Sequence, residues 1–492
     1  MAGCGKTPGK AGDPSYLYVS KIADKATLVD LSNSVGGLSM PAPNLTEASL
    51  ARHLDGDASF EKAFIPGPDD AHPGHVGLGP VFNNTSCLNC HARDGRGFLP
   101  PVPSGQARVK LGSNESLLLR ISVEGLEALP KDADHLWGAP QPVPGFSGQL
   151  FHRGIYGLRP DSPGTGQADV YLSYESRVET YPDGRQVTLR KPLFAVENAY
   201  DGAASRLYQN DVRQSPRLAP PVAGLGLLEA ISEDDILAQA DPDDANGDGI
   251  SGKPNWVLDL VKQAAGNPTP LSLGRFGWKA STPHLLQQTV AALNNDMGVV
   301  STLLPTQNIF GTLLYDAFLA LVGSDLARLP TVEADDDFVD GVTFYSRTLG
   351  IPERRNVEDS TVLQGGRLFA QVQCIQCHAG AYEIKDWAEV PEFSGLKIYP
   401  FTDLLLHDMG EGLADNRRDF DADGREWRTT PLWGIGLTKL VNARAGFLHD
   451  GRARTLEEAI LWHGGEAAGS VEAFKNLSAA DRESLLRFIE SL

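Results

Sequence analysis

Two five-residue motifs in this sequence place a pair of cysteines directly before a histidine. They read Cys-Leu-Asn-Cys-His and Cys-Ile-Gln-Cys-His. A Cys-x-x-Cys pair alone is also typical of a redox dithiol or of half a zinc site. The histidine after both pairs favours haem c, because two thioether bonds fix the porphyrin and this histidine then binds its iron. The sequence therefore predicts two covalent haem groups, held by Cys87, Cys90, His91, Cys374, Cys377 and His378.

The remaining cysteine, Cys4, lies near the start of the sequence, so no pair is left for a structural disulfide. Met1–Cys4 resembles the end of a bacterial lipobox, and a small, polar stretch follows it. The alternative is a stray cysteine in a disordered tail. We expect a lipoprotein with lipid on Cys4, in the periplasm or the outer cell envelope, because bacteria attach haem c outside the cytoplasm.

The composition and net charge of the chain are those of a globular protein and argue against a nucleic-acid-binding one. The chain has 492 residues, of which 41% are hydrophobic and 22% charged, as in ordinary globular proteins. Its net charge of −20 argues against a nucleic-acid partner and suits a small cationic electron carrier, such as a cytochrome c or a cupredoxin. No run of 18 or more apolar residues is present, so we expect no transmembrane helix.

The two motifs lie in matching frames. Gly79–His91 and Gly366–His378 both have the order Gly, aliphatic, Phe, Cys, Cys, His. This order predicts the first helix of a cytochrome c domain, with the glycine at a close helix contact and the phenylalanine over the haem edge. We therefore expect a mainly α fold, with a tether at 1–40, a first haem lobe at 41–335 and a second at 336–492.

A helix that returns over the far face of the haem is predicted in each lobe, at Arg275–Gly298 and at Gly446–Ala467. Thr455 and Glu458 form a capping box ahead of an apolar stripe in the second of these helices. The first lobe also holds a long, loop-rich insertion. Within it, β-rich residues flank the turn signal Tyr181–Gly184 and predict a β-hairpin over 169–196.

The sixth iron position decides what each haem does. For the second haem, His463 follows the apolar face of the returning helix and is the predicted ligand. His449 is the alternative, although it could instead contact a propionate or fix a turn with Asp450. A buried histidine on such a face could also simply hydrogen-bond.

The returning helix of the first lobe has no histidine at the matching place. Asp296 and Glu229 are the two candidates for an acid that moves a proton between peroxide oxygens. Each could instead be a solvated carboxylate or a helix cap, and the neighbouring Met297 could be a ligand or part of the core. Trp278, just before this helix, could relay an electron between the haems.

A calcium site is predicted where the sequence opens like an EF-hand loop, with ligands Asp244, Asn246, Asp248 and the backbone of Ile250. The closing position is Asn255 instead of a glutamate, so the bidentate anchor is missing. The stretch Asp419–Glu426 has a similar opening. A plain acidic turn is the alternative for both.

The sequence resembles the bacterial di-haem oxidoreductases once labelled "thiol oxidoreductase", which are related to di-haem cytochrome c peroxidases. The similarity runs from about residue 75 to 467 and includes both haem motifs, Gly224–Val257, Leu273–Gly298 and Glu426–Ala467. It implies a peroxidatic N-terminal haem with a distal acid, and a C-terminal haem that receives electrons from a small cytochrome or cupredoxin.

The resemblance also bears on single residues. It places Asp296 at the distal acid and Trp278 at a bridging tryptophan, and it implies a calcium ion between the haems. In the peroxidase relatives a methionine holds the position of His463, so this chain departs from them toward bis-histidine ligation and a lower reduction potential. A thiol oxidoreductase activity has no support, because the cysteines after Cys4 all lie in the haem motifs.

We therefore expect a peroxidase-like enzyme that reduces hydrogen peroxide at the N-terminal haem, with electrons relayed by the C-terminal haem. One alternative is a pure electron-transfer cytochrome with both irons six-coordinate. Another is an enzyme whose high-valent haem oxidises a protein or polymer partner.

Overall fold

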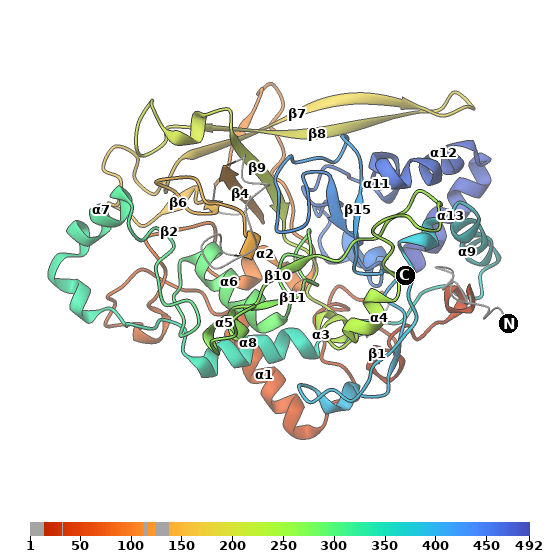
Figure 1. Ribbon diagram of the computed structural model, residues 1–492, viewed down its shortest axis with the longest axis horizontal. Coiled ribbons are helices and arrows are strands. Elements are labelled where there is room, and N and C mark those ends of the chain that lie inside the picture. Colours follow the sequence, from red (N-terminus) through yellow and green to blue (C-terminus); the bar gives the residue numbers. More distant parts are fainter. Residues whose placement is uncertain (1–13, 32, 113–115, 124–136) are drawn as a thin grey trace.

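The structure is a computed structural model that describes residues 14–31, 33–112, 116–123 and 137–492 (Figure 1). Helices make up 33% and strands 17% of it, and the strands form several small sheets. The prediction of a mainly α fold is therefore wrong. The physical reason is that most strands have only two or three residues, too few to show the alternating pattern by which strands are recognised in a sequence.

The α-helices differ widely in length, and many begin at a Ser, Thr or Asp whose side chain accepts a hydrogen bond from the first turn. In the described residues they are α1 (Glu47–Glu61), α2 (Cys87–Cys90), α3 (Leu225–Glu229), α4 (Glu233–Leu237), α5 (Leu260–Ala264), α6 (Leu285–Met297), α7 (Leu313–Val322), α8 (Asp336–Thr348), α9 (Ser360–Gln371), α10 (Thr438–Val441), α11 (Leu456–Trp462), α12 (Ala468–Asn476) and α13 (Ala479–Ser491).

The strands pair as β5-β4-β9, β3-β7-β8 and a set of two-stranded sheets. Their bounds are β1 (Thr27–Leu28), β2 (Val81–Phe82), β3 (Val109–Lys110), β4 (Leu117–Val123), β5 (Gln149–Leu150), β6 (Arg153–Gly154), β7 (Asp169–Thr180), β8 (Gln186–Glu197), β9 (Val212–Leu218), β10 (Trp256–Leu258), β11 (Leu271–Leu273), β12 (Ile351–Pro352), β13 (Tyr382–Glu383), β14 (Lys397–Ile398), β15 (Leu406–Asp408) and β16 (Glu426–Arg428).

The predicted hairpin is present as β7 and β8, which are paired along their whole length. Figure 1 shows it crossing the molecule from the first-lobe sheets to the region of α11 and α12. At its tip the hydroxyl of Tyr181 donates to Glu457 of α11 at 2.7 Å, and its ring meets Phe474 of α12. The insertion of the first lobe therefore supports the helix that leads to His463.

The two motif frames fold differently. The second is helical as predicted up to Gln371, in α9. The closest approach to α13 is made by Gly365, one residue before the frame, where a side chain would collide with the Ser484 carbonyl; a Cβ on Gly366 would lie 3.2 Å from the Phe488 ring. In the first frame the predicted helix is wrong, because Val81 and Phe82 form β2, paired with β6. The proline after Gly79 lacks an N–H, and the neighbouring strand supplies the partners that a helix would have used.

Residues 14–31 and 33–40, within the predicted tether, pack on the second lobe. Tyr16 and Leu17 are buried in the largest apolar core together with Phe369 and Phe488, and β1 pairs with β12. Cys4 lies outside the described residues. The boundaries at 40 and 335 stay a prediction, and α8, just after the second boundary, packs against α1 and α6.

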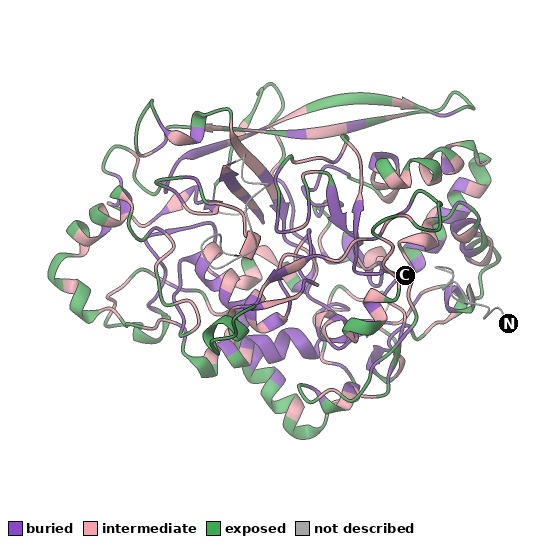
Figure 2. Ribbon diagram, viewed as in Figure 1, coloured by how far each residue is buried: buried purple, intermediate pink, exposed green. Residues whose placement is uncertain are grey.

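Burial is concentrated at the centre of the molecule, while peripheral segments such as α1, α7, α12 and the hairpin tip carry many exposed residues (Figure 2). No helix in the described ranges has the length and apolar character needed to cross a membrane.

Candidate functional site

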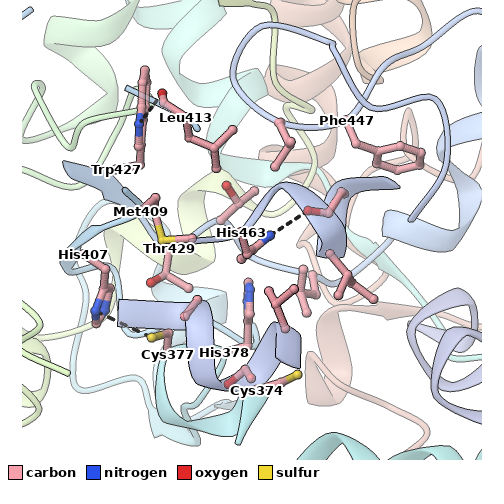
Figure 3. A pocket seen from close by; sticks show the side chains of 18 of the residues that line it. Cys374, Cys377, His378, His407, Met409, Leu413, Trp427, Thr429, Phe447 and His463 are labelled. Atoms are coloured by element: carbon pink, nitrogen blue, oxygen red, sulfur yellow. Dashed lines mark hydrogen bonds between the residues drawn. The ribbon is translucent and has the colours of Figure 1, made fainter. Parts of the chain in front are cut away.

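The second motif opens onto a cavity. Cys374, Cys377 and His378 follow α9 and line this cavity together with His463 and Met409 (Figure 3). The Nδ1 of His378 lies 3.0 Å from the backbone carbonyl of Phe401. A hydrogen bond donated from Nδ1 fixes the ring and leaves Nε2 as the free, metal-binding nitrogen.

His463 lies on the opposite wall, as Figure 3 shows, at the end of α11. Thr455 caps this helix by accepting from the Glu458 N–H, as predicted from the sequence. The Nδ1 of His463 lies 2.7 Å from the Ala459 carbonyl, so its Nε2 is also free. Burial lowers the pKa of both His378 and His463, to about 4 for His378, which favours the neutral imidazoles that bind metals.

His449, the alternative ligand, belongs to another wall of the same cavity. Its ring stacks on Trp427 with the centroids 3.7 Å apart, and burial lowers its pKa to about 3. This stacking holds the imidazole flat against the indole. The side chain of Asp450 lies 3.6 Å from its Nε2.

The first motif opens onto a larger cavity. Cys87 and Cys90 are the ends of α2, whose first turn is capped by the Ser86 hydroxyl. His91 follows, with its Nδ1 2.7 Å from the Pro220 carbonyl, so the arrangement of His378 is repeated. His91 is the one histidine among the described residues that line this cavity, in contrast to the second.

Asp296 lines the first cavity near the end of α6. Its carboxylate accepts a hydrogen bond from the Gln149 amide at 3.0 Å, and the same amide donates to Asn83 at 2.6 Å. Arg120 of β4 lines the same cavity. Loss of surrounding water raises the pKa of Asp296, while the charge of Arg120 and the bond from Gln149 oppose this rise.

Three of the four motif thiols lack the lowered pKa of a redox-active pair. Burial raises the pKa of Cys87, Cys90 and Cys374 to about 12, whereas redox-active pairs depend on a lowered thiol pKa. Among the described residues, no group of three or more His, Cys, Asp or Glu side chains is arranged to hold a metal ion, as a zinc site would need.

One comparison with known proteins is decisive. Residues 16–492 match the family model described as "Di-haem oxidoreductase, putative peroxidase". The chain belongs to this family. No curated protein and no solved structure shows a significant match to it. Membership in a di-haem family agrees with two separate cavities, each with two cysteines and a histidine whose Nε2 is free.

Trp278 lines both cavities of this di-haem oxidoreductase. The side chain is 7% exposed, and its indole N–H donates to the Leu218 carbonyl at 2.8 Å. The indole is therefore held between the two sites, where the sequence placed it. Trp427, by contrast, lines the second cavity alone.

The structure separates the two candidate acids. Glu229 lines neither cavity. Its carboxylate accepts from the backbone N–H of Leu285 at 2.7 Å and from Arg347 at 2.6 Å, so it caps α6 and pairs with α8. Met297, next to Asp296, is 3% exposed and packs in the apolar core of the first lobe, and it also lines the first cavity.

We expect Glu229→Gln to destabilise the fold and to leave peroxide reduction unchanged. The substitution removes the more buried of the two carboxylates that lie 2.6 Å from the largely buried Arg347 and leaves only the half-exposed Glu389, which costs up to about 3 kcal/mol. Urea unfolding of the haem-loaded protein measures this loss, with Asp70→Asn, from the exposed pair with Arg328, as the control. A large loss of peroxide reduction with normal stability would instead assign Glu229 a role in peroxide reduction.

The predicted calcium loop makes an internal hydrogen-bond network. The carboxylate of Asp244 accepts from the Gly249 N–H, that of Asp248 from the Ile250 N–H, and the Asn246 amide oxygen from the Asp248 N–H. These bonds are those of an acidic turn. In the other acidic stretch the Lys279 ammonium donates to the Asp423 carbonyl, so a lysine supplies the positive charge there.

Sequence reasoning missed His407 and Met409, which both line the second cavity. His407 lies between Glu466 at 2.7 Å and Asp403 at 2.9 Å. Burial lowers the pKa of His407, but the charges of Cys377 and Asp403 outweigh this and raise it well above 6.5. Nothing in the spacing of these residues from the haem motif indicated their position.

Arg120 and Gln149 were missed for a related reason. They come from β4 and β5, strands of the loop-rich insertion far along the chain from both the motif and Asp296. A hydrogen-bonded pair such as Gln149–Asp296 has no local pattern, so only the folded chain reveals it.

Proposed function

We propose that this di-haem oxidoreductase reduces hydrogen peroxide in the first cavity with electrons that enter through the second. The observation that carries the proposal is the difference between the two cavities. The second presents two imidazoles with free Nε2 atoms, His378 and His463, whereas the first presents one, His91, together with Asp296 and Arg120.

We further propose covalent attachment of both haems, through Cys87 and Cys90 in the first cavity and through Cys374 and Cys377 in the second. The adjacent cysteines and free imidazole nitrogens in each cavity support this attachment. His378 and His463 together would make the second site a low-spin electron carrier, because a strong ligand on both sides leaves no place for a substrate.

A haem in the first cavity would supply an iron atom that binds peroxide and passes electrons to it. The overall reaction consumes two electrons and two protons and converts one peroxide into two waters. Asp296, as a carboxylate, takes the proton from one peroxide oxygen and returns it to the oxygen that leaves. Arg120 stabilises the negative charge that develops on the leaving oxygen, and Gln149 holds the carboxylate in place.

Trp278 supports the route between the two sites, because its indole lines both cavities. We propose that electrons reach the first site past this side chain. The net charge of −20 favours a small basic electron-transfer protein, a cytochrome c or a cupredoxin, as the donor. A periplasmic or envelope location, with lipid on Cys4, follows from the proposed haem attachment and the lipobox-like start.

The spin states of the two haems test this proposal. We expect one high-spin and one low-spin haem in the electron paramagnetic resonance spectrum of the oxidised protein, with peroxide changing the high-spin signal. Cys87→Ala, which weakens attachment of the first haem, should remove the high-spin signal together with peroxide consumption. Two low-spin haems that ignore peroxide would contradict the proposal and favour a pure electron-transfer cytochrome.

A further inference from the structure

We propose that Arg96 and Arg428 bind a carboxylate of the haem in the second cavity and thereby set its reduction potential. Haem carries two propionate side chains. Each is a carboxylate, the kind of anion that a guanidinium group binds through charge-assisted hydrogen bonds. The inference rests on the part of the proposed function that places a haem in the second cavity, and is independent of the peroxide chemistry in the first.

Arg96 is a buried cation without a counter-ion. The residue is 4% exposed and lines the second cavity. Its Nη1 is buried without a hydrogen-bond partner, and no ion pair between described residues includes it. Its guanidinium instead lies over the rings of Trp278, at 5.4 Å, and Phe447, at 5.9 Å. Aromatic rings attract a cation only weakly and leave the N–H groups free for an anion.

Arg428 lies at the end of β16 and lines both cavities. The side chain donates to the carbonyls of Gly277 and Thr429, each at 3.0 Å. These partners are neutral, and within the described part of the chain Arg428 also has no carboxylate within ion-pair distance. Burial lowers the pKa of Arg428, whereas the charge of Asp403, which lies beyond ion-pair distance, raises it, so this cation is only partly compensated.

Other buried cations nearby are paired. Arg217 reaches Asp419 at 2.8 Å, Lys279 reaches Asp415 at 2.9 Å, and Arg452 reaches Asp450 at 2.7 Å. Burial lowers the pKa of Arg96 and Arg428 to about 10, and the charge of Arg428 adds to the effect on Arg96. Two neighbouring buried cations destabilise one another, so an anion is expected where both meet the cavity.

A propionate of the haem is the anion that fits this position. The rest of the second cavity is mostly apolar, as a porphyrin requires, and includes Phe369, Leu413 and Ile460. A propionate between the arginines would be paired and removed from water. The backbone N–H of Arg428 also donates to the Trp278 carbonyl at 2.9 Å, so the arginines and the indole form one connected unit between the cavities.

The charge of this unit has a defined effect on redox chemistry. A cation near a haem favours the reduced form, which carries one positive charge fewer, and so raises the reduction potential. Pairing with the arginines also keeps the propionate ionised across neutral pH, so the reduction potential does not change through its protonation. The arginines would thus offset part of the low potential that ligation by two histidines produces.

We expect Arg96→Met to lower the midpoint potential of the low-spin haem. The potential should also fall as the pH rises from about 5 to about 9, because a buried propionate that has lost one of its two cations now titrates in this range. Spectroelectrochemical titration of the haem-loaded protein measures both effects, and haem content is determined on the same samples. Arg96→Lys, which keeps the charge, should retain most of the wild-type potential.

Arg159→Met is the matched control. Arg159 is as buried as Arg96, but it pairs with Asp161 and lines neither cavity, so the low-spin potential should not change. A wild-type potential and pH profile in Arg96→Met, at full haem content, would overturn the proposal. If Arg96→Met fails to fold, Arg96→Gln, which keeps N–H donors and loses the charge, decides by the same measurement.

A free anion is the other source of a carboxylate-like ligand. The wild-type potential should not depend on added phosphate, because the propionate already fills the site; a potential that shifts with phosphate would overturn the assignment to the haem. Peroxide consumption is not measured in any of these experiments. Failure of the peroxidase proposal would therefore leave their outcome unchanged.

Discussion

Asp296→Asn is expected to reduce the rate of peroxide reduction about 100- to 10,000-fold, the usual contribution of a general acid–base group. Asparagine keeps the size of the side chain and cannot take up the peroxide proton. The variant should fold and load both haems normally, because Asn can still accept the hydrogen bond from Gln149. Stopped-flow mixing of the reduced protein with peroxide measures the rate.

The rate of peroxide reduction, measured across a range of pH, gives a second test of Asp296. Because loss of water raises the pKa of Asp296, the wild-type rate should fall as the pH drops through a value above the usual carboxyl range. Below that value the side chain is protonated and no longer acts as a base. This acidic limb should be absent in Asp296→Asn.

Glu333→Gln is the control for the loss of a buried carboxyl group. Burial raises the pKa of Glu333 to about 7, yet the residue lines neither cavity. It should reduce peroxide at the wild-type rate. A wild-type rate in Asp296→Asn would instead exclude proton transfer by this residue.

His463→Ala is expected to convert the second haem from low spin to high spin. Removal of the imidazole leaves the side of the iron opposite His378 without its nitrogen ligand. Electron paramagnetic resonance and visible spectra of the oxidised protein report this change directly. The signal of the first haem should stay the same, because His463 does not line the first cavity.

Two further variants test whether His463, and not His449 or Met409, is the iron ligand. His449→Gln should leave the second haem low spin, because His449 is stacked on Trp427. Met409 also lines the second cavity and has a sulfur that could bind iron in the absence of His463. If His463→Ala stays low spin and becomes high spin only when Met409→Leu is added, Met409 has replaced His463 as the iron ligand. Loss of the low-spin signal in His449→Gln alone would reject His463 as the ligand.

Features encoded by neighbouring residues could be predicted. The helix cap at Thr455 and the turn at the tip of the hairpin depend on residues a few positions apart, and both are present in the structure; of the predicted capping box only the bond to Thr455 forms, because Glu458 accepts from the Arg454 N–H. The frame around Gly79 could not be predicted in this way. The same pattern forms a helix in α9 and a strand in β2, because contacts from β6 outweigh local preference.

The choice between Asp296 and Glu229 shows the same limit at the site. Both are acids near an apolar stretch, and no local pattern distinguishes them. The packing of α6 decides: one end of this helix presents Asp296 to the cavity, while its first turn receives the carboxylate of Glu229. Their different environments come from the orientation of one helix relative to its neighbours.

The sequence by itself determined the two Cys-x-x-Cys-His motifs and the candidates for further ligands, because the proposed covalent anchor and its adjacent histidine need only neighbouring residues. Tertiary structure alone decided what surrounds each site. Arg120, Gln149, Arg96 and Arg428 come from separate strands and loops, and their charges and hydrogen bonds acquire a role only where folding brings them to a common cavity wall. Side-chain chemistry at these sites is a long-range property of the chain, which local spacing cannot encode.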